Sequence, residues 1–136
     1  MHDLKQLKNT LHNVLRSFPE VEAAFLFGSV AEGRAREGSD IDLALVPADN
    51  LLKERKLELL AAMTEAGLDN LDLVILDIED PVLRYEAIRQ NCLVYAREGF
   101  DRGGYYSRGM REYFDIEPIL AVQREAYKKR LERGQT

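Results

Sequence analysis

The sequence predicts an α/β domain in which helices flank one sheet. Four short apolar runs, bounded by glycine, proline or polar residues, are typical of buried strands. Most of the segments between them carry apolar residues at the helical spacing of three and four. Strands that alternate with helices favour a layered architecture, and 136 residues are enough for one domain with its own core.

The first two elements are predicted to be a helix and a buried strand. Apolar residues recur every three or four positions from Leu4 to Phe18, and Pro19 ends this pattern. The apolar run Val21–Phe27 follows and is predicted to be a strand. It stops at Gly28, where a stretch rich in glycine and serine indicates a loop, with or without a short helix.

Three further strands and two helices complete the predicted sheet and its flanks. The strands are the apolar runs Ile41–Val46, Leu71–Leu76 and Cys92–Tyr95. A helix over residues 50–66 is predicted to begin at Asn50 as its cap and to end before Gly67. A second helix covers Asp80–Gln90, with Pro81 in its first turn. The order of the strands in the sheet does not follow from these patterns.

The C-terminal part of the chain differs in charge and in aromatic content. The last 40 residues hold nine Lys and Arg against seven Asp and Glu, whereas the rest of the chain has a net charge of −7. Tyr, Met and Leu side chains share one helical face between Tyr106 and Leu131, and Pro118 is predicted to bend or divide this helix. We therefore expect a core over residues 1–97 and a helical, tyrosine-rich segment over residues 98–136.

This C-terminal segment is predicted to dock a partner. Tyr and Met are enriched in the cores of protein interfaces, and both residue types lie on the helical face described above. The alternative, for half of these positions, is that the helix packs against the protein's own sheet.

Charge and composition exclude several functional classes. The net charge of −5 argues against a protein that coats nucleic acid or an anionic membrane. Cys92 is the single cysteine, and His2 and His12 are the two histidines, so no disulfide framework, cysteine-based zinc cluster or histidine-based catalytic centre is expected. The N-terminus does not resemble a signal peptide, and no run approaches the roughly 20 apolar residues of a membrane span. We therefore expect a cytoplasmic protein whose chemistry is carried by carboxylates.

Three carboxylates interrupt the predicted strands. Asp40 and Asp42 stand at the entry of the second strand, and because side chains alternate they point to one side of the sheet, about 7 Å apart. Two like charges so placed call for a cation, and Mg²⁺ takes one or two carboxylates together with waters and phosphate oxygens. Asp72 is the second residue of the third strand and would join them if the two strands are neighbours. Such a set suits two-metal phosphoryl or nucleotidyl transfer. The alternative is that these residues cap a turn or end a strand in solvent.

A Gly-Ser pair lies ten residues before the first of these carboxylates. Gly28 and Ser29 directly follow the first predicted strand. Glycine lets backbone N–H groups approach a phosphate closely, and the serine hydroxyl adds a donor. The pair is therefore a candidate phosphate loop, although neither the Walker pattern nor the dinucleotide fingerprint is present in the sequence.

The segment Gly28–Asp42, GSVAEGRAREGSDID, resembles the GS-x10-D-x-D signature of polymerase-beta-like nucleotidyltransferases. The small size is similar to the minimal nucleotidyltransferase (MNT) subfamily, whose members are often antitoxins of HEPN ribonuclease toxins. The resemblance covers residues 20–95. It implies the polymerase-beta-like fold, a small mixed sheet flanked by helices. It also implies an antitoxin that transfers AMP from ATP to a tyrosine of its cognate HEPN toxin.

The same resemblance assigns roles to individual residues. Gly28, Ser29 and Ser39 would bind ATP. Asp40, Asp42 and Asp72 would bind the two magnesium ions of the family and serve catalysis. Asp72 would also help to activate the incoming hydroxyl.

The resemblance has one departure, and the sequence leaves other functions open. Glu32 occupies a position that is commonly basic in the family loop, while Arg34 and Arg36 nearby are able to substitute for that charge. A protein that neutralises its toxin by occlusion alone is one alternative. A small-molecule nucleotidyltransferase is another, although few residues remain for an acceptor domain. Nucleic acid and membrane are not expected as partners. The protein is expected to form a hetero-oligomer with the toxin.

Overall fold

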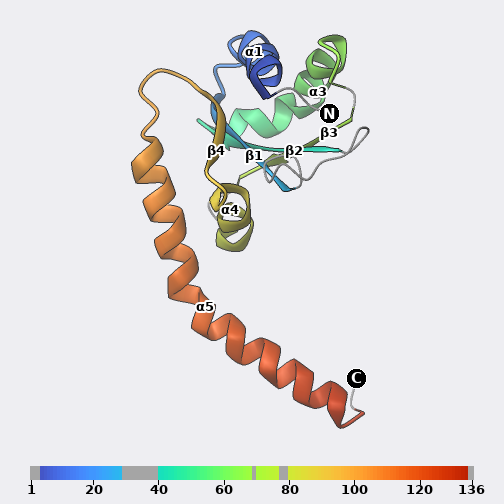
Figure 1. Ribbon diagram of the computed structural model, residues 1–136, viewed down its shortest axis with the longest axis vertical. Coiled ribbons are helices and arrows are strands. Elements are labelled where there is room, and N and C mark those ends of the chain that lie inside the picture. Colours follow the sequence, from blue (N-terminus) through green and yellow to red (C-terminus); the bar gives the residue numbers. More distant parts are fainter. Residues whose placement is uncertain (1–3, 29–39, 69, 77–79, 135–136) are drawn as a thin grey trace.

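A computed structural model describes residues 4–28, 40–68, 70–76 and 80–134 of the chain (Figure 1). The elements follow one another as α1 (Leu4–Leu15), β1 (Val21–Phe27), β2 (Ile41–Pro47), the 3₁₀ helix η1 (Asn50–Arg55), α3 (Lys56–Glu65), β3 (Leu71–Ile75), α4 (Pro81–Ile88), β4 (Cys92–Ala96) and α5 (Arg102–Glu132). The predicted α/β class and all four predicted strands are confirmed.

The strands form one mixed sheet in the order β3-β2-β1-β4. The central strand β1 is antiparallel to both β2 and β4, whereas β2 and β3 run parallel. A parallel pair needs a crossover connection, and η1 with α3 supplies it. The two strands that carry the predicted carboxylates are therefore direct neighbours.

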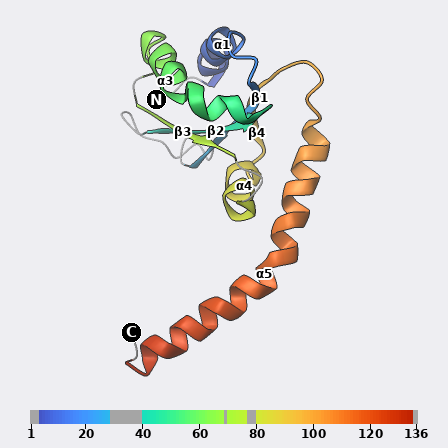
Figure 2. The ribbon, with the colours of Figure 1, turned by 180° about the vertical axis from the view of Figure 1, so that it is seen from behind.

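Helices cover both faces of the sheet (Figures 1 and 2). On one face lie α1 and α3, whose side chains Leu7, Leu11 and Leu59 are buried against alternate residues of the strands. On the other face lie α4 and the first part of α5. A second apolar cluster there contains Phe25 and Ile88, with Tyr105 packed against it. The chain thus builds three layers around the sheet.

The helix predicted over residues 50–66 is divided and is capped one residue earlier than expected. Residues 50–55 form a 3₁₀ helix, and the α-helix begins only at Lys56. The Asp49 carboxylate accepts a hydrogen bond from the backbone N–H of Leu51 at 2.9 Å, so Asp49 and not Asn50 is the cap. Both are good capping residues, and the carboxylate that reaches the free N–H group decides the start.

The long C-terminal helix α5 has two different environments. Its first part packs on α4, where Gly109 lies against Ile88 and the rings of Tyr85 and Tyr113 stack 3.8 Å apart. The rest extends away from the sheet, as Figures 1 and 2 both show. Pro118 lies inside the helix and does not divide it, although the helix changes direction along its length in Figure 1. The helix therefore continues through this proline and is not divided there.

Candidate functional site

Two of the predicted carboxylates lie directly opposite each other on neighbouring strands. Asp42 of β2 and Asp72 of β3 are register partners in the parallel pair. Adjacent strands are about 4.8 Å apart, and residues in register point to the same face of a sheet. This is the face covered by α4 and α5, because Ala44 and Val46, which share the parity of Asp42, belong to that apolar cluster. The condition set by the sequence, that the two strands are neighbours, is met.

The third carboxylate stands just before β2. Asp40 is exposed and precedes the strand by one residue, and its negative charge acts on Asp42. The structure therefore brings Asp40, Asp42 and Asp72 to one end of the sheet, with Asp42 and Asp72 on the same face.

The electrostatics of this end of the sheet favour a cation. Partial burial raises the pKa of the Asp42 carboxyl, and the negative charges of Asp72 and then Asp40 raise this pKa further. The ionised form of Asp42 is therefore unfavourable in the folded protein, and a bound cation would stabilise it.

Gly28 fits against the Asp42 carboxylate. It follows β1, whose last residue, Phe27, is the register partner of Asp42. Its φ of +73° lies in the left-handed region, and a Cβ atom at this position would collide with Oδ2 of Asp42. A side chain at residue 28 would thus have to push the carboxylate away. The first residue of the Gly-Ser pair is consequently placed at the carboxylates.

The carboxylates fit magnesium as partial ligands. Among the residues that the structure describes, no three acidic, histidine or cysteine side chains converge closely enough to hold a metal ion by themselves. Magnesium usually binds one or two carboxylates and completes its octahedron with waters and substrate phosphates. The donor set of Asp42 and Asp72, both hard oxygen ligands in register, has this composition.

Several predicted site residues lie outside the described part of the chain. These are the two serines expected to bind ATP and the charged residues of the loop between them: Ser29, Glu32, Arg34, Arg36 and Ser39.

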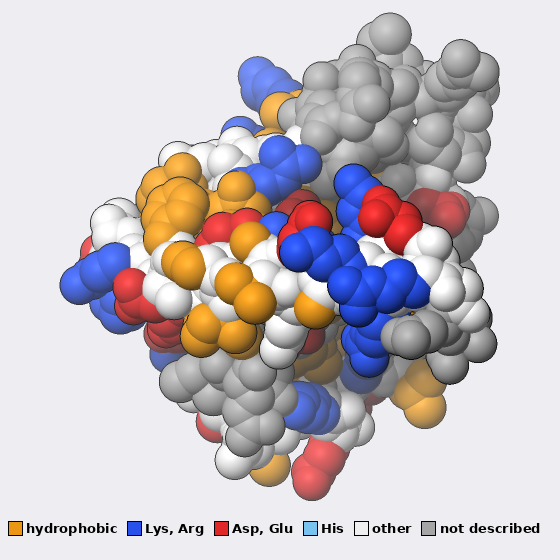
Figure 3. Space-filling view, turned by 90° about the horizontal axis from the view of Figure 1, so that it is seen from below, with side chains coloured by type: hydrophobic (Ala, Val, Ile, Leu, Met, Phe, Trp, Pro, Cys, Tyr) orange, Lys and Arg blue, Asp and Glu red, His pale blue; other side chains and the backbone are white. Residues whose placement is uncertain are grey.

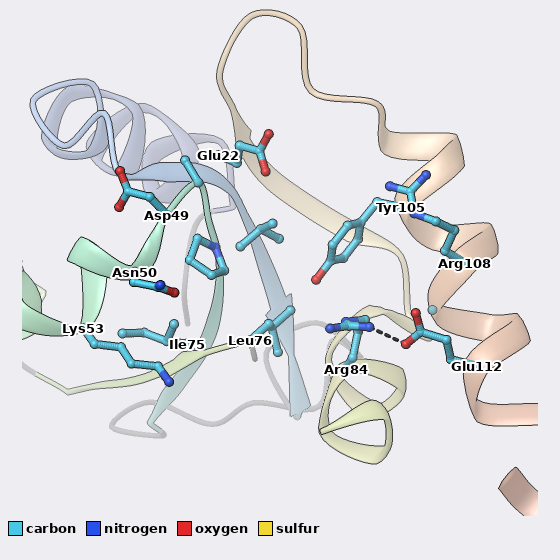
Figure 4. Close-up of a pocket in the computed structure, with 14 residues that line it drawn as sticks. Glu22, Asp49, Asn50, Lys53, Ile75, Leu76, Arg84, Tyr105, Arg108 and Glu112 are labelled. Atoms are coloured by element: carbon cyan, nitrogen blue, oxygen red, sulfur yellow. Dashed lines mark hydrogen bonds and ion pairs between the residues drawn. The ribbon is translucent and has the colours of Figure 1, made fainter. Parts of the chain in front are cut away.

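A cavity that the sequence did not reveal lies on the same sheet face. It measures about 470 Å³ and opens between the carboxyl ends of β2 and β3, η1, and the helices α4 and α5 (Figure 4). We call it the distal cavity. Its lining includes Glu22, Val46, Lys53, Arg84, Tyr105 and Arg108.

Arg84 is the buried charge of this cavity. Its exposure is 6%, and it forms an ion pair with Glu112 of α5 while its guanidinium lies 5.9 Å from the centre of the Tyr105 ring. Burial raises the pKa of Tyr105, and the positive charge of Arg84 opposes this increase. The sequence gives one weak signal, an arginine among the apolar residues of α4. Its partner is 28 residues away and could not be paired with it from sequence.

Comparisons with known proteins agree with this geometry. The polymerase beta nucleotidyltransferase family model matches residues 9–99. The protein adenylyltransferase MntA of Shewanella oneidensis is 32% identical over 95 residues, which cover 69% of this chain and 68% of that protein.

Solved structures extend the likeness to nearly the whole chain. A toxin–antitoxin structure with AMP-PNP has a TM-score of 0.70 at 25% identity, covering 92% of this chain and 98% of that chain. A tri-AMPylated Shewanella oneidensis HEPN toxin in complex with an MNT antitoxin has a TM-score of 0.67 at 23% identity, with coverage of 96% and 99%, and supports the fold alone. No helix in the described residues is both long and apolar enough to cross a membrane.

Proposed function

The chain belongs to the polymerase beta nucleotidyltransferase family, and from this membership we propose that it transfers AMP from ATP to a tyrosine of a cognate HEPN toxin and so acts as an antitoxin. The observation that carries the proposal is the register pair Asp42 and Asp72 on one sheet face. The similar protein adenylyltransferase indicates the group transferred, and the similar toxin–antitoxin structure with AMP-PNP indicates nucleotide and partner.

The carboxylates are the proposed ligands of magnesium. Asp40 and Asp42 would hold magnesium together with the triphosphate, and Asp72 would hold the metal that serves the reaction and help to activate the incoming hydroxyl. Bound magnesium would neutralise charge on the triphosphate and lower the pKa of the acceptor hydroxyl. The raised pKa of Asp42 supports this assignment, because the like charges around it require a positive partner.

The acceptor tyrosine must lose its proton before it reacts. The pKa of tyrosine is about 10, so a neutral phenol is a weak nucleophile at pH 7. Asp72 is exposed and able to take this proton. The phenolic oxygen then bonds to the α-phosphorus, the bond from that phosphorus to the bridging oxygen breaks, and pyrophosphate leaves with the electron pair.

Gly28, Ser29 and Ser39 are the proposed contacts to the ATP phosphates. Gly28 stands beside Asp42 with no side chain between its backbone and the metal-binding carboxylate. A glycine in this position allows the phosphate chain to approach both the backbone N–H groups and the metal.

The outer part of α5 is the proposed docking surface for the toxin. Apolar side chains there are unusually exposed: Ile119 at 59%, Val122 at 69% and Tyr127 at 57%. Basic residues are interspersed with them, and hydrophobic and basic side chains lie next to one another in the view from below in Figure 3. Exposed apolar residues mixed with arginine are typical of an interface rather than of a free helix.

Asp42→Asn provides the direct test of catalysis. The variant keeps the shape of the side chain and removes the charge that binds magnesium. Transfer from labelled ATP to the purified toxin should fall at least about a thousandfold, whereas Glu65→Gln, an exposed residue at the end of α3, should leave it unchanged. Full transfer by Asp42→Asn would refute the assignment. If the inactive variant still neutralises the toxin as well as wild type, occlusion is the function.

A further inference from the structure

The distal cavity lies along the strand direction from the catalytic carboxylates. Val46 lines it and follows Asp42 by four residues in β2, which separates their Cα atoms by about 13 Å. Both side chains point to the same face of the sheet. On the neighbouring strand, Val74 lies on this face between Asp72 and the cavity and is only partly buried. Ala44, which lies between Asp42 and Val46 on this face of β2, is fully buried, so the partly exposed path between the carboxylates and the cavity runs over Val74 of β3.

The walls of the cavity suit a flat heterocycle. Its floor is apolar, formed by Val46, Pro47 and Leu76, and the ring of Tyr105 closes one side (Figure 4). The volume of about 470 Å³ falls in the range of small-molecule sites. Tyr105 is held in place because its ring stacks on Phe25, with 6.0 Å between the ring centres and 19° between the planes. A rigid aromatic wall over an apolar floor is a surface on which a base can stack.

The charged residues of the cavity match a nucleotide better than a simple anion or an apolar molecule. Arg84 and Arg108 approach from α4 and α5, and Lys53 lies on the opposite side in Figure 4. Glu22 and Glu112 add carboxylate acceptors. Adenine carries ring nitrogens that accept hydrogen bonds from arginine or lysine and an amino group that donates to a carboxylate. A wholly anionic ligand would be repelled by these carboxylates.

We propose that the distal cavity binds the adenosine of an adenylate group, either that of substrate ATP or one already attached to the toxin. The proposal rests on the proposed transfer of AMP, which places an α-phosphate at Asp42. A nucleotide bound there extends its ribose and base over Val74 of β3 toward the cavity. ATP and an AMP group attached to the toxin present the same adenosine to the cavity. ATP would fill it before transfer, and the attached AMP would fill it after the first transfer.

Ala48→Trp tests the proposal. Ala48 is exposed and lines the cavity, so the indole ring fills the space without disturbing the core. Ala61→Trp, at an exposed position on α3, is the matched control. The affinities for ATP and for inorganic triphosphate, which lacks adenosine, are measured by calorimetry with Mg²⁺. Thermal unfolding checks that both variants fold. Arg108→Gln, which removes a charge and adds no bulk, is the second variant.

The two sources predict different results. If the adenosine of ATP occupies the cavity, Ala48→Trp weakens ATP binding about tenfold, Arg108→Gln weakens it several-fold, and triphosphate binding is unchanged. If an attached AMP occupies it, ATP binding matches the control, and the intact mass of the toxin shows that addition stops after the first AMP.

Other results overturn the proposal. It fails if Ala48→Trp matches Ala61→Trp in both ATP affinity and the number of AMP groups added. It also fails if ATP and triphosphate lose affinity equally, because the effect would then not depend on adenosine. If the wild-type protein adds one AMP or none, the number of AMP groups cannot distinguish the variants. The comparison of ATP affinity between Ala48→Trp and Ala61→Trp then decides whether the proposal stands. The absence of transfer by the wild-type protein would refute the proposed function. The ATP-binding experiment could still be interpreted in that case, because binding does not require transfer.

Discussion

Replacing Asp42 by asparagine should stabilise the fold in the absence of metal. At a charge separation of roughly 6 Å, two carboxylates repel by about 0.7 kcal/mol in water and about 2.8 kcal/mol at an effective dielectric constant of about 20. Asp42 is half-buried and its register partner Asp72 is exposed, so an intermediate value applies. We expect the variant to gain about 1–2 kcal/mol at pH 7, which raises Tm by about 3–8 °C in a domain of this size.

The pH dependence of this gain follows from the raised pKa of Asp42. The folded state binds the proton of Asp42 more readily than the unfolded state, so ionised Asp42 costs stability above its folded pKa. As pH falls through that raised pKa toward the ordinary value, wild type recovers this loss. The difference between Asp42→Asn and wild type should therefore be largest at pH 7 and shrink toward pH 3.5.

Urea denaturation of the metal-free proteins at several pH values measures this difference. Glu65→Gln removes one negative charge from the end of α3, which covers the opposite face of the sheet, and is the control for net charge. Carboxylates that do not interact with Asp42 contribute equally in both proteins and cancel in the comparison. Equal or lower stability of Asp42→Asn at pH 7, in a protein that folds normally, would refute the argument that this end of the sheet holds unbalanced charge.

Three further predictions concern single positions. Gly28→Ala should destabilise the protein by about 1–3 kcal/mol and reduce AMP transfer, because its φ is positive and its Cβ would meet Asp42; wild-type stability in urea would contradict this. Asp49→Ala removes the cap of η1 and should cost about 1 kcal/mol, whereas Asp49→Asn should cost little; thermal unfolding compares the two. Val122→Asp should weaken toxin binding in calorimetry without a change in Tm, and unchanged affinity would rule out the outer part of α5 as the docking surface.

The strands could be predicted from sequence because each is a short apolar run ended by a residue that breaks the pattern. The run Val21–Phe27 is an example, and its predicted bounds are those of β1. The approach of Asp42 and Asp72 could be stated only as a condition, since the strand order depends on long-range pairing. Once β2 and β3 are known to be parallel neighbours with Asp42 and Asp72 in register, the alternation of side chains along each strand puts both carboxylates on one face.

Features that depend on local hydrogen-bond geometry or on tertiary contacts could not be predicted from the sequence. Asp49 and Asn50 are adjacent residues of similar capping strength, and the choice between them follows from which side chain reaches a free N–H group. The burial of Arg84 depends on α5, which contributes Glu112 and Tyr105 to its surroundings. The sequence left open whether Pro118 bends or divides the last helix, and the structure shows that it does not divide it.

The most direct test of the account is the intact mass of the purified cognate toxin after incubation with this protein, ATP and Mg²⁺. The account predicts an added mass equal to one or more AMP groups, localised to a tyrosine, and no addition with Asp42→Asn or with Mg²⁺ removed. An unmodified toxin with the wild-type protein, under conditions in which the two proteins form a complex, would contradict it.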